Sequence, residues 1–107
     1  MQMFVKIYQY HIRKDKIETF LHIQEKAAEI YGQHLTFHTM YLNSKDEETK
    51  WMEISRFNDE DEYHRSIDMI NKEEELQELY KKFQACLLSE IIEEDFIEKM
   101  EMKISSK

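Results

Sequence analysis

Two side chains near the middle of the sequence could take part in proton transfer. His64 follows Tyr63 at the start of a predicted helix, and Glu53 lies in the middle of a predicted strand. A neutral imidazole can accept a proton from a phenolic compound near neutral pH. We therefore consider His64 a candidate general base. The alternative is a half-buried histidine that hydrogen bonds to a nearby acidic side chain such as Glu60.

Glu53 is the second candidate, because its strand neighbours are aromatic. It shares one face of the strand with Trp51 and Phe57, whereas Arg56 points to the other face. A carboxylate on such a face costs free energy unless it is paired or exposed. Glu53 either lines a pocket beside His64, where it holds the histidine or the substrate, or pairs with an arginine from another strand.

Several aromatic side chains could stack on a flat ligand. The predicted substrate-binding residues are Tyr8, Phe37, Trp51 and Tyr63, with Tyr10 and Tyr41 on the same strands. The alternative is that these rings form a core or a dimer interface.

Other catalytic groups are not predicted. His34 and His38 are four residues apart on a predicted strand, which separates them by ~13 Å, too far to share a metal ion. Cys86 lies in an apolar helical stripe and is predicted to be a small buried hydrophobic residue. The chain has one glycine, so a glycine-rich phosphate loop is excluded. We predict neither a metal site nor a cofactor.

Hydrophobic periodicity divides the chain into strands and helices. The alternating pattern of strands and the three-to-four-residue spacing of helices predict the segments and their order. Strands are expected at Met3–Ile12, Leu35–Leu42, Lys50–Phe57 and Ile91–Ile97, and helices at Asp15–Tyr31 and from Asn58 to Leu87.

Three residues mark the expected helix ends. Gly32 is predicted to adopt the left-handed conformation that ends the first helix. Asn58 is predicted to cap the second helix, ahead of an acidic first turn. Asn71 with Glu74 three residues later resembles another capping box, which predicts a break near Asn71.

The order of elements is β-α-β-β-α-β, which is typical of the ferredoxin-like fold. We therefore predict an α+β protein with a four-stranded antiparallel sheet and its helices on one face. Residues 1–100 form one domain, and residues 101–107 form a flexible C-terminal tail. The uncovered face of the sheet would carry large apolar side chains, and this predicts a homodimer with the two sheets packed face to face.

Composition excludes several classes of partner. The chain has 107 residues and a formal net charge of −8, which disfavours binding to nucleic acid and to anionic membranes. A signal peptide and a membrane-spanning segment are not predicted, because no continuous apolar stretch is long enough. With one cysteine, no intrachain disulfide can form. We expect a soluble cytoplasmic protein.

The segment from Lys50 to Asp59, followed by Tyr63 and His64, resembles the antibiotic biosynthesis monooxygenase-like domains of the dimeric α+β barrel superfamily. The opening strand and helix, from Tyr8 to Phe20, fit the same family. This resemblance implies a pocket between sheet and helices, in which a histidine at position 64 can lie. Members include quinone-forming oxygenases that use no cofactor, and haem-degrading enzymes.

The haem-degrading branch fits this chain poorly. That branch has an asparagine on the first strand, where this chain has Tyr8 and Gln9. His64 stands near the position of its tryptophan, and Glu74 near the position of its histidine. The resemblance therefore implies oxidation of a small phenol or quinol by dioxygen without a cofactor. The alternative is a non-catalytic homodimer that binds a small ligand or a protein partner.

Overall fold

The computed structural model describes residues 2–106 and confirms the predicted α+β architecture. Four strands form one antiparallel sheet in the order β2-β3-β1-β4. The elements are β1 (Phe4–His11), a short 3-10 helix (Lys14–Lys16), α1 (Ile17–Tyr31), β2 (Phe37–Asn43), β3 (Lys50–Phe57), α2 (Glu60–Ile70), α3 (Glu74–Cys86) and β4 (Ile92–Ile97).

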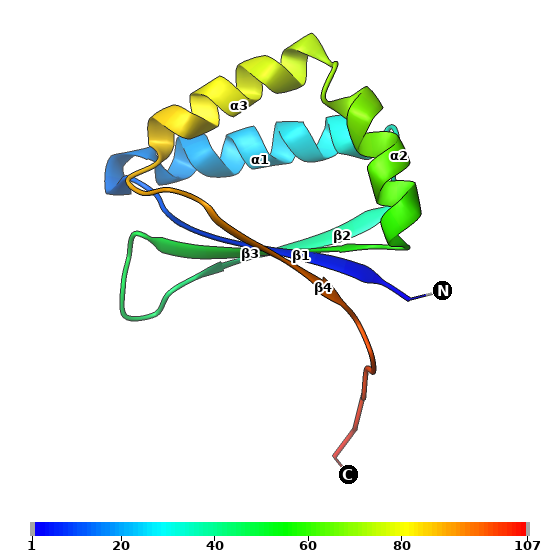
Figure 1. Ribbon diagram of the computed structural model, residues 1–107. Helices are drawn as coiled ribbons and strands as arrows, with labels where there is room; N and C mark the ends of the chain where they lie inside the picture. Colours follow the sequence, from blue (N-terminus) through cyan, green and yellow to red (C-terminus); the bar gives the residue numbers. More distant parts are fainter. Residues whose placement is uncertain (1, 107) are drawn as a thin grey trace.

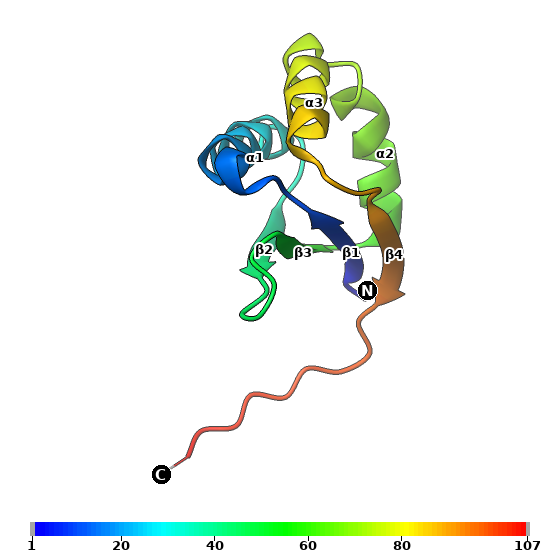
Figure 2. The same cartoon turned by 90° about the vertical axis from the view of Figure 1, so that its left-hand side faces the viewer.

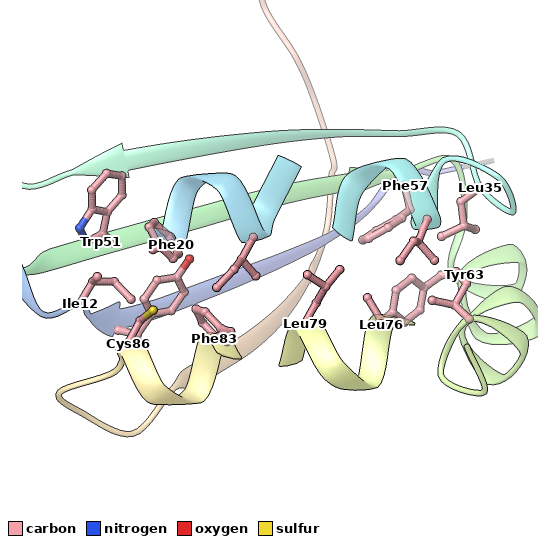
Figure 3. Close-up of a cluster of buried hydrophobic side chains, with 14 of the residues drawn as sticks. Ile12, Phe20, Leu35, Trp51, Phe57, Tyr63, Leu76, Leu79, Phe83 and Cys86 are labelled. Atoms are coloured by element: carbon pink, nitrogen blue, oxygen red, sulfur yellow. The ribbon is translucent and has the colours of Figure 1, made fainter. Parts of the chain in front are cut away.

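The three helices lie on one side of the sheet (Figures 1 and 2). Helices α1 and α3 run side by side across it, and α2 stands at one end. The core lies between these two layers, where Phe20 from α1 contacts Tyr10 from β1 and Phe83 from α3. Figure 3 shows Phe20 and Phe83 at one end of this core, and Phe57 and Tyr63 at the other.

Strand pairing decides which side chains face the helices. Tyr8 on β1 is paired with Glu53 on β3, and Tyr41 on β2 is paired with the same glutamate. Paired residues point to the same face of a sheet. The shared face of Trp51, Glu53 and Phe57 expected from the alternation is therefore the helix-covered face.

One charged side chain is buried beneath the helices. The side chain of Lys6 on β1 is 7% exposed, and its Nζ lies 2.6 Å from both Glu93 Oε1 and Asp95 Oδ1 on β4. The ammonium also lies 5.4 Å from the ring centroid of Tyr63. The two carboxylates pair the ammonium and tie the edge strand to the centre of the sheet.

The helix ends differ from the sequence-based predictions in their chemistry. Gly32 has φ −64° and is not left-handed. The chain continues beyond it in right-handed turns, in which the amide N–H of His34 donates to the carbonyl of Tyr31. These turns satisfy the terminal carbonyls, so a left-handed residue is not needed.

The cap residues of α2 and α3 also differ from those predicted from the sequence. Asp59, rather than Asn58, caps α2, because its Oδ1 accepts from the amide of Glu62 at 2.8 Å. Asn71 ends α2 and does not cap α3. The predicted break near Asn71 is present, but its residues satisfy the end of one helix instead of starting the next.

The face of the sheet opposite the helices is largely apolar, although Arg56, His38 and Glu94 also lie on it. Its half-buried and exposed side chains include Met40 (42% exposed), Leu42 (44%) and Phe96 (41%). After β4, residues 98–106 run away from the domain on this side, outside any helix or strand (Figure 2). Within residues 2–106, no helix is long and apolar enough to cross a membrane.

Candidate functional site

A cavity of about 640 Å³ lies between helices α1 and α3 and the sheet. This volume is within the range of sites for ligands of several rings. All six tyrosines of the chain line it, although they come from five different elements. They are Tyr8, Tyr10, Tyr31, Tyr41, Tyr63 and Tyr80.

Glu53 lies on the floor of this cavity, in the middle of β3. Tyr8 and Tyr41 flank it on the neighbouring strands, and the Tyr10 hydroxyl donates a hydrogen bond of 2.8 Å to its Oε1. Burial raises the pKa of Glu53 to about 7, although the Tyr10 hydrogen bond opposes this shift. Glu53 therefore exchanges a proton at neutral pH, as a general acid or base must.

Two further pairs of polar side chains in the cavity are hydrogen bonded. The Tyr41 hydroxyl donates to Gln24 Oε1 at 2.9 Å, and the hydroxyls of Thr39 and Ser55 are 2.7 Å apart. Burial raises the pKa of Tyr31 to about 12. Burial likewise raises the pKa of Tyr8, Tyr10, Tyr41 and Tyr63, so these tyrosines stay neutral at physiological pH, while Glu53 titrates there.

Most of the predicted ligand-binding residues do meet at this cavity. Tyr8, Phe37 and Tyr63 line it together with Glu53. Trp51 does not: it is buried in the core, 7% exposed, with its ring 5.1 Å from that of Phe20. The strand places Trp51 two residues from Glu53, where helix α1 covers it.

His64 is not part of the cavity wall. Its side chain is 58% exposed, and its Nε2 lies 3.2 Å from Oε2 of Glu60 on the same helix. Consecutive residues of an α-helix point about 100° apart. Because Tyr63 faces the core, His64 faces outward, which corrects its expected position beside Glu53.

Sequence analysis did not single out the cavity residues of the helices. Tyr31 and Gln24 belong to the inner stripe of α1, and Tyr80 lies on α3. Ala27 and Ala28 also line the cavity. Two small residues in a stripe of otherwise larger side chains were the available signal, because small residues leave space between packed helices.

Comparison with solved structures places this fold among known proteins. SnoaB, a cofactor-independent oxygenase from Streptomyces nogalater, superposes with a TM-score of 0.66 at 11% identity, covering 99% of this chain and 100% of SnoaB. A protein provisionally assigned as an antibiotic biosynthesis monooxygenase from Nitrosomonas europaea has a TM-score of 0.71 at 12% identity, covering 90% and 89%. The chain has the fold of these monooxygenase proteins.

The same fold also occurs in proteins without a known activity. A nipsnap family protein of unknown function from Agrobacterium tumefaciens has a TM-score of 0.71 at 17% identity, covering 90% of this chain and 87% of its own. No protein-family model matches the sequence, and no curated protein is significantly similar to it. At these identities the likeness shows the fold alone.

Proposed function

We propose that this protein is an oxygenase that converts a flat phenol or quinol to a quinone with dioxygen and without a cofactor. Glu53 would act as the general base. The observation that carries this proposal is a buried carboxyl group on the wall of an aromatic cavity, where burial raises its pKa to about 7. The shared fold with a cofactor-independent oxygenase supports it by analogy.

For a phenol, the reaction can be written with Glu53 as its proton carrier; a quinol would instead lose two electrons and two protons, and dioxygen would be released as hydrogen peroxide. The carboxylate takes the phenol proton, and the electron-rich ring reduces dioxygen as a carbon–oxygen bond forms. Protonated Glu53 then returns its proton to the resulting peroxide. Loss of the ring C–H proton breaks the oxygen–oxygen bond, which releases water and leaves the quinone. The ring loses four electrons, and dioxygen supplies one oxygen atom to the quinone and one to water.

The cavity suits such a substrate for two reasons. Its wall is dominated by aromatic rings, which favour stacking with a flat ligand. The carboxyl group of Glu53 is buried on the floor of the cavity, so a phenol that reaches it loses its water and meets the carboxyl group directly. Because Tyr10 already occupies Oε1, the other carboxylate oxygen is the acceptor for the substrate.

Oxygen consumption with a naphthol or a dihydroxynaphthalene tests the proposal. We expect quinone formation by the wild type and a loss of at least about 100-fold in kcat for Glu53→Gln. Glu29→Gln is the matched control, because it makes the same change on the exposed side of α1. Equal rates for Glu53→Gln and the wild type would refute the role of Glu53. Ligand binding without turnover would favour a non-catalytic binding protein.

We also propose that a second copy of the chain covers the open face of the sheet. Apolar side chains from all four strands lie there, and the exposed ones would lose water on association. Size-exclusion chromatography with light scattering should give the mass of a dimer. Ile54→Glu on this face should give a monomer, whereas His22→Glu on the exposed side of α1 should leave the dimer intact.

A further inference from the structure

The cavity carries a negative charge and almost no compensating positive charge. Among the lining residues that the structure describes, Glu53 and Lys81 are the charged ones. Lys81 lies on α3, where its side chain is 73% exposed and its Nζ is 3.6 Å from Glu78. Water and Glu78 therefore screen Lys81, whereas Glu53 is enclosed.

We propose that this cavity binds aromatic compounds that carry a protonated amine, in preference to neutral or anionic compounds of the same shape. Glu53 is the counter-ion of the ammonium group, and the surrounding tyrosine rings form an aromatic cage. The inference goes beyond the proposed oxygenase reaction, because it requires the cavity and its charge but not turnover. An amine of this kind would compete with the phenol for Glu53.

Aromatic rings hold cations through the negative charge on their faces. The same protein shows this chemistry a short distance away. The ammonium of Lys6 lies 5.9 Å and 5.4 Å from the ring centroids of Tyr8 and Tyr63, two residues that also line the cavity. It is paired there with two carboxylates, Glu93 and Asp95. Rings and carboxylates thus already bind one ammonium beside the cavity.

Lys6 does not neutralise the cavity. Its single positive charge faces two carboxylates, so this group of three residues carries a net negative charge. An anionic ligand would then meet Glu53 without a buried cation to pair with, which is unfavourable in an enclosed site. The proposed phenol substrate avoids this problem, because its proton moves to Glu53 and the total charge is unchanged.

The titratable groups that line the cavity together with Glu53 come from both the sheet and the helices. They are Tyr8 and Tyr10 on β1, Tyr41 on β2, Tyr31 on α1, Tyr63 on α2, and Tyr80 with Lys81 on α3, while Glu93 on β4 faces Tyr8. The enclosed tyrosines remain neutral, so Glu53 sets the charge of the site near neutral pH. Preference for an ammonium should follow the ionisation of this carboxyl.

The raised pKa of Glu53 limits how strongly the cavity can prefer an ammonium group over a neutral one. Enclosure raises the pKa of Glu53 from 4.5 to about 7, which corresponds to roughly 300-fold in its proton affinity. A bound ammonium can recover part of that cost by pairing with the carboxylate. We therefore expect a preference of at least about tenfold for the ammonium over its neutral analogue.

Isothermal titration calorimetry with three matched probes tests the inference. The probes are naphthylmethylamine, naphthylmethanol and naphthoic acid, which share a ring system and differ in charge. At more than one pH unit above the pKa of Glu53, we expect the amine to bind most tightly, the alcohol less tightly and the acid most weakly. The preference for the amine should disappear more than one unit below that pKa, where the carboxyl is protonated. Glu53→Gln should lack the preference at both pH values, and Glu29→Gln should behave like the wild type at both.

Two results would overturn the inference. One is that naphthoic acid binds as tightly as the amine to the wild type at high pH. The other is that Glu53→Gln keeps the amine preference, which would place the ammonium elsewhere. Should Glu53→Gln fail to fold, the pH dependence of the wild type decides in the same way. These binding results are independent of oxygen consumption, so failure of the oxygenase proposal remains distinguishable.

Discussion

Replacing Glu53 by glutamine should make the protein more stable at alkaline pH and less sensitive to pH. The folded pKa of about 7 lies above the ordinary value of 4.5, so the folded protein binds this proton more tightly than the unfolded chain does. The free energy of unfolding therefore falls as pH rises between these two values. At 1.36 kcal/mol per unit, the ionised carboxyl costs about 3 kcal/mol of stability above the folded pKa.

Glutamine keeps the acceptor for the Tyr10 hydroxyl but has no charge to bury. Urea denaturation of wild type and Glu53→Gln across this pH range gives the difference in unfolding free energy. We expect the difference in unfolding free energy to be small near the pKa of Glu53 in the unfolded chain. Above its pKa in the folded protein, the difference should reach about 2–3 kcal/mol in favour of the variant. Other carboxylates contribute equally to both proteins and cancel.

Glu29→Gln is the control, because it removes one exposed carboxylate and gives the same net charge. It should follow the wild type at every pH. Parallel curves for the wild type and Glu53→Gln would refute the argument, since they would mean that Glu53 titrates normally in the folded protein.

Three further changes test the packing and the site. Tyr10→Phe removes the hydrogen bond that favours the ionised carboxylate, so the pKa of Glu53 should rise further, as measured by NMR titration of the side chain; an unchanged pKa would contradict that role. Phe20→Ala should cost about 3–5 kcal/mol in chemical denaturation, because Phe20 is 0% exposed in the core; a loss below about 1 kcal/mol would contradict the packing. Asp59→Ala should cost about 0.5–2 kcal/mol through loss of the cap of α2, whereas Asn58→Ala should cost less.

Local patterns were sufficient to predict the elements of the fold. Alternation in the strands identified the face that Glu53 shares with Phe57, because the side-chain period of a strand is two wherever it lies. Helix ends were predicted less well. Gly32 and Asn58 have suitable chemistry for caps, but neighbouring backbone groups and Asp59 satisfy the helix ends instead.

Which residues line the cavity could not be predicted from local patterns, because it depends on contacts between distant parts of the chain. Tyr63 and His64 are adjacent in the sequence, yet one lines the cavity and the other lies at the surface. That difference is set by the orientation of α2 about its own axis where it packs against the sheet. Trp51 and Glu53 likewise share a face of β3, but α1 covers the first and leaves space over the second.

The sequence by itself determined the order of strands and helices, which residues of a strand share a face, and the acidic net charge of −8. These follow from local periodicity and from composition. Only the tertiary structure decided that six tyrosines from five elements line the same cavity as one buried carboxyl group. The unusual pKa of Glu53 arises from that enclosure, because the free energy of a charge depends on all the groups that replace its water.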